Sequence, residues 1–279
     1  MRVLVFGATG MLGKALTGRW SGGDIIGLGS AQADIRLPEQ VNGAVNETKP
    51  DWIVLAAAYT DVDGCEINPT LAASVNTQGA INVANAAAED GARLLFVSTD
   101  YVFNGKKSSP YETNDLRNPI NVYGKSKADA EEGIIRILPD CCILRTSWLF
   151  GPGGKCFPDT ILKLAAIRSE IEVVNDQRGC PTYTFDLADA IVKLCWSNAG
   201  GIIHATNAGD CSWYEFASEV LRQSGSTTKV RPTTSERFVR LAERAKYSVL
   251  SPASLTAYDI SMRTWQQTLP DYLHERSTA

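Results

Sequence analysis

A phenol and an ammonium group stand four residues apart in the stretch NVYGKSK, residues 121–127. On a helix, this spacing puts Tyr123 and Lys127 on the same face. A cation beside a phenol lowers the pKa of the phenol, which lets the tyrosine exchange a proton near neutral pH. The same spacing occurs in many surface helices, so the pair indicates proton transfer only if the chain also holds a partner for that chemistry.

A glycine-rich turn near the N-terminus predicts a binding site for such a partner. The stretch GATGMLG spaces Gly7, Gly10 and Gly13 as G-x-x-G-x-x-G, directly after the apolar run RVLVF. Between a strand and a helix, such glycines let the backbone approach a pyrophosphate, and the helix N-terminus faces that anion with free N–H groups. We therefore predict a dinucleotide-binding loop in preference to a turn without function.

The residues after the second expected strand bear on which dinucleotide binds. NAD is usually held there by an acidic side chain that binds the ribose hydroxyls. Gly29 and Ser30 occupy this place, and no Arg or Lys stands beside them to attract a 2′-phosphate. NADPH is favoured, and NADH stays possible. Asp34 and Ile35 could flank the adenine, although Asp34 could equally be a solvated residue that precedes a helix.

Small residues end the third expected strand, in AAAYT at residues 56–60. Small side chains let a dinucleotide lie across the strand ends at the point where the strand order reverses. Tight packing of a helix on the sheet would favour the same residues, so this stretch supports the loop without proving it.

Apolar runs and helical stretches alternate along the chain, as expected for β-α-β units and a parallel sheet. We expect strands at 2–6, 24–28, 52–58, 92–100, 141–151 and 201–209, with helices over 70–89 and 121–138. The predicted fold class is α/β, a Rossmann-type doubly wound parallel sheet with a smaller C-terminal substrate domain.

The character of the sequence changes near residue 151, where GPGGKCFP reads as a loop and later segments carry more Trp, Tyr and Pro. We interpret 1–150 as the dinucleotide-binding domain and 151–279 as mainly the substrate-binding domain. The segment near 201–209 is expected to return to the first sheet.

Composition excludes several classes of function. The 279 residues are 44% hydrophobic with a net charge of −4, which provides no general attraction to nucleic acid or to a membrane. No apolar run approaches a membrane span and the N-terminus does not resemble a signal peptide, so a cytoplasmic protein is expected. Seven cysteines form no C-x-x-C pair, and with only His204 and His274 we expect neither a zinc site nor a His-based triad. His204 stands in an apolar strand and is interpreted as structural.

Four more polar or aromatic residues each have two interpretations. Trp148 follows the fifth strand and could stack on a sugar or a base, or fill the core. Asp100 could bind a sugar hydroxyl or cap a turn. Arg178 and Lys155 are candidates for the phosphates of a nucleotide, with solvated surface charge as the other interpretation.

Taken in order, these stretches resemble the dTDP-4-dehydrorhamnose reductase family of the extended short-chain dehydrogenase/reductase superfamily. The resemblance runs through about the first 220 residues and is carried by GATGMLG, AAAYTDVDGCE, STDYVFNG, PINVYGKSK, RTSWLFG, DQRGCPT and SWYEFA. The combination of STDYVF, NVYGKSK and RTSW is its most specific part.

The resemblance implies a role for each matched residue. Thr99 would supply a hydroxyl at the end of the fourth strand, Tyr123 would donate a proton, and Lys127 would bind the nicotinamide ribose and tune the tyrosine. The sugar would contact Thr99, Asp100 and Trp148. The residues that would line the cofactor are Gly10, Met11, Leu12, Asp34, Ile35, Ala58, Tyr59 and Thr60, in addition to the glycines of the loop.

The reaction implied is hydride transfer from NAD(P)H to the 4-keto group of a nucleotide-activated deoxysugar, converting dTDP-4-dehydro-L-rhamnose to dTDP-L-rhamnose in dTDP-rhamnose biosynthesis. Another nucleotide-sugar epimerase or reductase of this superfamily remains an alternative, as does a non-catalytic dinucleotide-binding regulatory subunit. A dehydratase is disfavoured, because Tyr101 stands where such enzymes carry a glutamate.

The resemblance also bears on metal and oligomeric state. Some family members hold Mg²⁺ at a dimer interface through acidic residues, and Ala15 and Phe185 appear at those positions. We therefore expect no metal, and both a monomer and a homodimer stay open.

Overall fold

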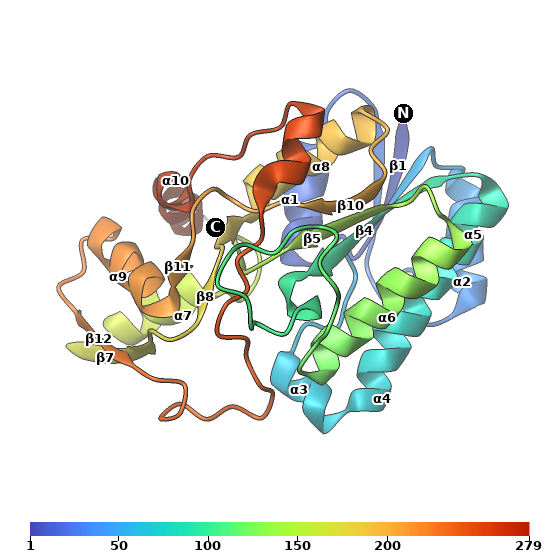
Figure 1. Cartoon of the computed structure of the whole chain (residues 1–279). Helices are drawn as coiled ribbons and strands as arrows, with labels where there is room; N and C mark the ends of the chain where they lie inside the picture. The colour runs from blue at the N-terminus through green and yellow to red at the C-terminus, as the bar shows by residue number, and fades with distance from the viewer. Residues whose placement is uncertain (279) are drawn as a thin grey trace.

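Six parallel strands form the central sheet of the computed structural model, which describes residues 1–278 (Figure 1). The strand order is β10-β5-β4-β3-β1-β2, and every neighbouring pair is parallel. The strands are β1 (Arg2–Phe6), β2 (Asp24–Leu28), β3 (Trp52–Leu55), β4 (Arg93–Thr99), β5 (Cys142–Thr146) and β10 (Gly201–His204). The predicted fold class is confirmed, and the segment at 201–204 lies in the central sheet as β10, beside β5.

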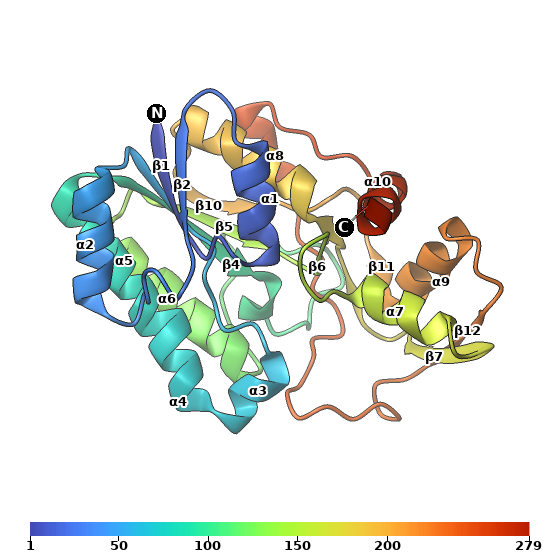
Figure 2. The same ribbon diagram turned by 180° about the vertical axis from the view of Figure 1, so that it is seen from behind.

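Helices cover both faces of this sheet, as Figures 1 and 2 show. One face carries α1 (Met11–Arg19), α8 (Thr184–Trp196) and the short 3-10 helix η3 (Pro252–Tyr258). The other carries α2 (Pro38–Thr48), α5 (Gly79–Asp90) and α6 (Val122–Ile137). Successive strand side chains point to opposite faces, so Val3 and Val5 join one core while Leu4 and Phe6 join the other. This explains why the strands read as continuous apolar runs.

The strand order reverses between β1 and β3, because the chain winds outward from β1 to β2 and then turns back to start β3 on the other side. Ligands of such sheets bind outside the carboxyl ends of the strands at this switch point. The glycine loop after β1 and the alanines after β3 both lie there.

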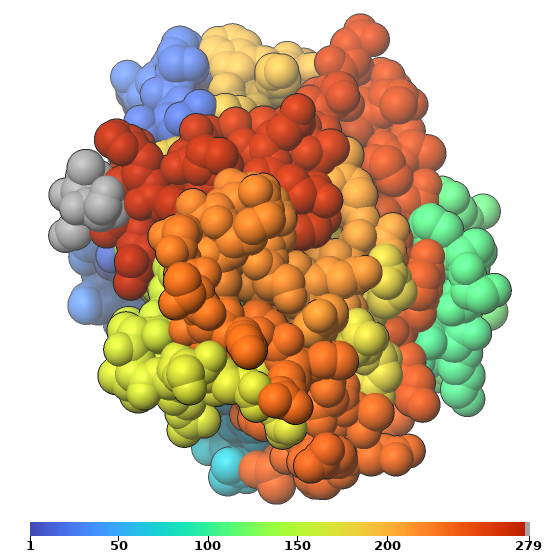
Figure 3. All heavy atoms as spheres, turned by 90° about the vertical axis from the view of Figure 1, so that its left-hand side faces the viewer, coloured from blue at the N-terminus to red at the C-terminus, as the bar shows by residue number. Residues whose placement is uncertain are grey.

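A smaller layer packs beside the carboxyl ends of the strands, and Figure 3 shows it from its outer side. It comprises α7 (Phe157–Ala165), β7 (Glu170–Val174), β8 (Arg178–Gly179), β11 (Cys211–Ser212), α9 (Trp213–Gln223), β12 (Lys229–Thr233) and α10 (Trp265–Thr278). Its core is aromatic and contains Phe150, Phe216, Trp265 and Tyr272. Since α8, β10 and η3 pack on the central sheet, the chain crosses between the two layers several times after residue 151. None of the helices described is both long and apolar enough to span a membrane.

The predicted helix over 70–89 is present, but its middle is π-helical. The structure has α4 (Pro69–Ala72), a π-helical turn (Ala73–Gln78) and then α5, with right-handed helical backbone at both junctions. The π turn contains Asn76, which is 1% exposed and accepts a hydrogen bond from the backbone N–H of Tyr59 at 2.7 Å while its amide donates to the Tyr59 carbonyl at 3.0 Å. The helix therefore deforms where a buried side chain satisfies the backbone after β3.

The predicted strand over 141–151 is interrupted. The strand conformation of β5 ends before Trp148, whose φ is +47°. The chain continues as β6 (Leu149–Phe150), which pairs with β9 (Thr182–Tyr183) outside the central sheet. A non-glycine residue with positive φ is uncommon. This break takes the chain out of the sheet at its carboxyl edge, where it enters the smaller layer.

A buried ion pair joins α6 to β5. Arg145 donates from Nη2 to Glu131 Oε2 at 2.7 Å and from Nε to Oε1 at 2.9 Å, and the two side chains are at most 1% exposed. Ser98 donates a further hydrogen bond to Glu131 Oε1 at 2.5 Å. Both carboxylate oxygens are therefore satisfied without water, which offsets part of the desolvation of the charges.

We expect Arg145→Met to lower the free energy of unfolding by about 3 kcal/mol, because it leaves the Glu131 carboxylate buried without its main partner. Arg117→Met should cost less than about 1 kcal/mol, since its contact with Glu131 is at 3.4 Å and Arg117 is partly exposed. Urea denaturation of both variants measures the difference. The double variant Glu131→Met/Arg145→Met should recover stability, and a double variant as unstable as Arg145→Met would contradict this account.

Candidate active site

The three predicted catalytic residues line one cleft at the carboxyl edge of the sheet. Thr99 ends β4, and Tyr123 and Lys127 lie in the first turns of α6. Lys127 is 2% exposed, donates from Nζ to the Val97 carbonyl at 2.7 Å and lies 3.9 Å from the centroid of the Phe96 ring. The Thr99 hydroxyl donates to Asp100 Oδ1 at 3.0 Å. The tip of β4 and the start of α6 thus bring an alcohol, a phenol and an amine into one space.

A glycine permits the close approach of α6 to the 3-10 turn (Asp100–Val102) that follows β4. A β-carbon on Gly124 would lie 2.1 Å from the Tyr101 carbonyl oxygen, so any other residue would push the helix away. Asn121 caps the helix, and its Oδ1 accepts a hydrogen bond from the Gly124 N–H at 2.8 Å. The Tyr123 ring then packs edge-on against the ring of Tyr101.

The pKa of Tyr123 is raised, not lowered as the Tyr–Lys spacing predicts. Burial is the main cause, the negative charge of Asp100 adds to it, and a hydrogen bond with Thr99 opposes it. Burial also lowers the pKa of Lys127 to about 7, against the opposing charge of Glu131. The predicted lowering of the Tyr123 pKa by Lys127 is therefore wrong when only the groups of this chain act on the phenol. Helical spacing does not reveal how strongly burial removes a side chain from water. A phenol with a raised pKa keeps its proton at neutral pH, so Tyr123 holds the proton that a donor needs, although it is a weaker acid than a free tyrosine.

Asp100 lies beneath this cleft and is 1% exposed. Burial raises the pKa of its carboxyl to about 6, despite the nearby hydroxyls of Ser248 and Thr99. Its Oδ2 atom has no hydrogen-bond partner among residues 1–278. A buried acceptor without a donor is unfavourable for folding but is free to bind a hydroxyl group that enters the cleft.

The glycine loop forms the wall of the cleft opposite α6. Gly7 has φ +90°, and a β-carbon there would lie 2.5 Å from the Ala57 N atom, so the loop can pass this close to the end of β3 only with glycine. The predicted cofactor residues that line this cleft are Gly7, Gly10, Met11, Leu12, Gly13, Ala58 and Thr60. Tyr59 lines neither this cleft nor the next pocket, and its hydroxyl lies by Gly64.

A second pocket continues from the loop toward β2 and holds the predicted residues Asp34 and Ile35. It also holds Arg36, which sequence reasoning missed because only residues next to the strand end were considered. Arg36 donates from Nη2 to Asp34 Oδ2 at 2.5 Å, and this pairing holds the pKa of Asp34 below its usual range. Ser30 lies in the same pocket. A basic side chain a few residues beyond the strand was the signal available in the sequence.

Trp148 stands at the border between the cleft and the smaller layer. Its ring stacks on Trp213 with centroids 3.4 Å apart, so Trp213 is a site residue that sequence reasoning missed. Lys155 lines the cleft, whereas Arg178 pairs with Asp210 at 2.8 Å and does not line it. The second interpretation of Arg178, a surface charge, therefore agrees with the structure.

His204 lies in the core next to the Arg145 guanidinium, with 3.4 Å between Nε2 and Nη1. Burial and the charge of Arg145 lower the pKa of His204 to about 3. The imidazole is neutral and remote from the cleft, in agreement with its structural interpretation.

A third cavity of about 360 Å³ lies between the two layers. Phe157, Trp213 and Gln177 line it from the smaller layer, and Arg240 and Arg244 line it from the long segment after β12. A small pocket between them, which we call the neck, is lined by Asp100, Trp148, Trp213, Arg244 and Ser248, and it shares lining residues with both the cavity and the cleft. The cleft, the neck and the cavity are therefore neighbours, with aromatic and basic residues in their walls.

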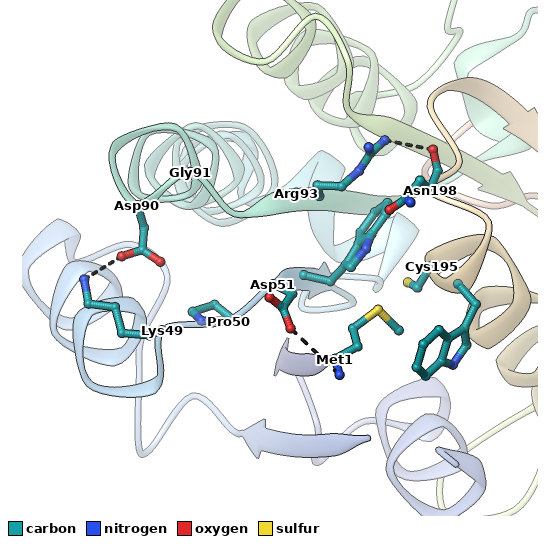
Figure 4. Close-up of a pocket in the computed structure, with 11 residues that line it drawn as sticks. Met1, Lys49, Pro50, Asp51, Asp90, Gly91, Arg93, Cys195 and Asn198 are labelled. Atoms are coloured by element: carbon teal, nitrogen blue, oxygen red, sulfur yellow. Dashed lines mark hydrogen bonds and ion pairs between the residues drawn. The ribbon is translucent and has the colours of Figure 1, made fainter. Parts of the chain in front are cut away.

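A larger hollow of about 700 Å³ lies at the opposite, amino-terminal ends of the strands (Figure 4). Its polar groups are paired with one another: Lys49 with Asp90 at 2.6 Å, and the N-terminal amine with Asp51 at 4.0 Å. None of the predicted site residues lies there. Its position on the amino side of the sheet does not suit an α/β ligand site, so we assign the chemistry to the carboxyl edge.

Within residues 1–278, no group of three or more His, Cys, Asp or Glu side chains is placed to hold a metal ion. Ala15 is buried where α1 meets α8, and Phe185 lies 5.3 Å beneath the guanidinium of Arg19, which pairs with Asp189. The donor set at these positions does not fit a metal ion.

The parallel doubly wound sheet, the glycine loop at its switch point and the half-buried Tyr123 with the buried Lys127 define a dinucleotide-binding α/β protein of the short-chain dehydrogenase/reductase type. The chain belongs to the family described as RmlD substrate binding domain, whose model matches residues 1–278. The family resemblance inferred from the sequence motifs is thereby confirmed.

Three similar proteins make the relationship specific. The spore coat polysaccharide biosynthesis protein SpsK of Bacillus subtilis is 42% identical over 100% of this chain and 99% of its own. The dTDP-4-dehydrorhamnose reductase of Streptomyces griseus is 40% identical over 97% of this chain and 92% of its own. The crystal structure of dTDP-4-dehydrorhamnose reductase from Bacillus anthracis in complex with NADP is 38% identical, with a TM-score of 0.96 over 98% of this chain and 99% of its own.

Asp100→Asn should stabilise the protein at pH 7 and have less effect near pH 4. The folded pKa of about 6 lies above the ordinary value of 3.8, so the stability linked to this proton is full at low pH and is lost as the pH rises through about 6. The asparagine carries no charge to desolvate, so we expect a gain of about 1–3 kcal/mol at pH 7. Urea unfolding of both proteins at pH 4 and pH 7 measures it. An equal difference at both pH values would exclude a titrating Asp100 as the cause.

Proposed function

We propose that this protein reduces the 4-keto group of dTDP-4-dehydro-L-rhamnose to give dTDP-L-rhamnose, with NADPH as the reductant. The observation that carries the proposal is that a cleft lined by a dinucleotide loop and a Thr–Tyr–Lys cluster shares residues, through the neck, with a cavity of nucleotide size. The named relatives support the same reaction, since one is a dTDP-4-dehydrorhamnose reductase and another was solved with NADP.

The chain's own groups account for the proton chemistry. Bound NADPH supplies a hydride for the carbonyl carbon of the keto sugar. Tyr123 donates its phenolic proton to the carbonyl oxygen, and the Thr99 hydroxyl donates a hydrogen bond to that oxygen as negative charge develops on it. Lys127, fixed by the Val97 carbonyl, binds the ribose next to the nicotinamide. The product alcohol therefore gains a hydride from the cofactor and a proton from the tyrosine.

The neck and the cavity suit the remainder of a nucleotide sugar. Asp100 Oδ2, which is buried without a donor, accepts a hydrogen bond from a sugar hydroxyl. Arg240 and Arg244 offer positive charge to the pyrophosphate, and Phe157 and Trp213 offer aromatic faces to the base. On this basis the part from residue 151 onward, together with Asp100, binds the substrate.

The pocket near β2 supports NADPH over NADH. Arg36 and Ser30 stand where the adenosine ribose of a dinucleotide on this loop would lie, and a guanidinium binds a 2′-phosphate well. The net charge of −4 provides no general attraction to nucleic acid or membrane, and we propose that the enzyme works in the cytoplasm.

Tyr123→Phe is expected to lower kcat by at least about 100-fold, since the ring stays but the proton donor is lost. The assay follows the absorbance of reduced nicotinamide with dTDP-4-dehydrorhamnose as substrate. Tyr258→Phe is the matched control, because Tyr258 bonds Gly200 far from the cleft. Wild-type turnover in Tyr123→Phe, with NADPH binding intact, would refute the assigned role. The absence of any NADPH oxidation by the wild-type protein would refute the proposed function.

Arg36→Ala should raise the KM for NADPH about tenfold, equivalent to about 1.4 kcal/mol, and leave the KM for NADH unchanged. The substitution removes a cation and leaves the negative charge of Asp34 beside the phosphate site. Arg19→Ala is the control, because Arg19 forms a similar ion pair with Asp189 away from the pocket. Equal changes for NADPH and NADH would show that Arg36 does not recognise the 2′-phosphate.

A further inference from the structure

The segment of residues 234–250, which we call the strap, runs from β12 back to the dinucleotide-binding layer and passes α3 (Val62–Ile67) (Figure 1). At its start, Ser235 donates from its backbone and hydroxyl to Asp176. Further along, the Arg178 N–H of β8 donates to the Lys246 carbonyl, and the Ser248 N–H donates to the Arg178 carbonyl. The last residues of the strap bond the dinucleotide-binding layer, where the Tyr111 N–H donates to the Val249 carbonyl at 2.8 Å. The strap is therefore fixed to both layers, and its middle lines the third cavity.

The middle of the strap is held by a carboxylate on α3. Asp63 Oδ1 accepts hydrogen bonds from the Ala242 N–H at 3.1 Å and from Arg244 Nη2 at 3.2 Å. Asp63 Oδ2 lies 3.7 Å from Arg240 Nη1, a looser contact. Ala242 is 1% exposed, so the strap is packed closely at this point.

The same part of the strap bonds to the first turn of the helix that carries Tyr123. Asn121 uses both ends of its amide: Oδ1 caps α6 by accepting from the Gly124 N–H, and Nδ2 donates to the Glu243 carbonyl at 2.8 Å. Glu66, on α3 like Asp63, accepts a hydrogen bond from the Val122 N–H at 2.8 Å. The strap, α3 and the start of α6 thus form a closed three-way junction two residues from Tyr123.

The junction also faces the nucleotide cavity. Asp63, Arg240 and Arg244 all line that cavity, so the two arginines that contact the Asp63 carboxylate are also within reach of an anion inside it. A pyrophosphate carries more negative charge than one carboxylate and accepts hydrogen bonds from several donors. An anion in the cavity would therefore draw both arginines, and with them the strap that bonds Asn121.

We propose that Asn121 and Asp63 are positioning residues that couple occupation of the nucleotide cavity to the placement of Tyr123. This inference rests on the proposed function, in which the cavity binds the nucleotide part of the substrate. Contacts far from the reacting carbon then raise kcat and do more than tighten binding, because part of their binding energy orients the proton donor.

The test compares two Asn→Asp substitutions at helix N-caps. Asn121→Asp keeps the acceptor for the Gly124 N–H but loses the donor to Glu243. Asn68→Asp is the matched control, since Asn68 caps α4 through the Leu71 N–H and has no hydrogen bond to the strap. The substrate is the methyl glycoside of the 4-keto sugar, which lacks the nucleotide, with dTDP added separately.

Added dTDP should raise kcat/KM for the methyl glycoside about tenfold in the wild type and in Asn68→Asp, and should not raise it in Asn121→Asp. Activation of Asn121→Asp equal to that of the wild type would overturn the coupling, as would the absence of activation in the wild type. If Asn121→Asp does not fold, Asp63→Asn replaces it. The new amide oxygen still accepts the hydrogen bond from the Ala242 N–H, but the negative charge that attracts Arg240 and Arg244 is removed.

Amide hydrogen exchange gives a readout that does not require turnover. Binding of dTDP should slow exchange at residues 122–124 in the wild type and in Asn68→Asp, and not in Asn121→Asp. If the wild type oxidises no NADPH with the complete nucleotide sugar, the proposed function fails, and the exchange pattern alone decides whether the cavity and α6 are coupled. Unchanged exchange in the wild type at saturating dTDP would overturn the coupling.

Discussion

The docking of α6 on the tip of β4 is the constraint on which the site depends. Three successive strand residues hold the helix: the Val97 carbonyl accepts from Lys127, the Ser98 hydroxyl donates to Glu131, and Thr99 lies beside Tyr123. Lys127, Glu131 and Tyr123 recur every four residues along one side of the helix, so a single placement of α6 makes all three contacts. The glycine at position 124 lets the helix approach the Tyr101 carbonyl just beyond β4, and a shift of the helix would move the phenol and the amine together.

This docking places charged groups out of water. Lys127, Asp100 and the Glu131–Arg145 pair are all nearly fully buried, and desolvation shifts the pKa values of Lys127 and Asp100 toward neutrality. In the Glu131–Arg145 pair, the hydrogen bonds between the two side chains compensate part of the cost of desolvation. Asp100 is not compensated in this way, because one of its oxygens has no donor in the described chain. We interpret this as stability given up at a position where a substrate hydroxyl completes the bonding.

The fold was largely predictable, because each buried parallel strand appears as an apolar run and the glycine loop follows one directly. The departures lie where a single long-range contact overrides local pattern. The helix over 70–89 is present but has a π-helical middle, where Asn76 bonds the backbone of Tyr59. The strand over 141–151 is interrupted at Trp148, which stacks on Trp213. Arg36 was missed because only residues next to the end of the second strand were weighed as phosphate partners, and Trp213 because it begins α9, far along the chain from the other site residues. The direction of the Tyr123 pKa was missed because spacing does not show burial.

The boundary between the two layers is therefore where the sequence is least informative and the chemistry most demanding. Trp148, Trp213 and Arg244 meet at the neck from segments far apart in the chain, and no local pattern requires them to meet. The stability of the central sheet does not depend on the residues of the neck, since a hydrophobic core covers each face of the strands. A substrate that spans both layers, however, can be held only if the crossing segments keep their register. The hydrogen bonds that Asp63 and Asn121 make to the strap fix that register, so specificity for a long, two-part substrate and orientation of the proton donor have a common structural origin.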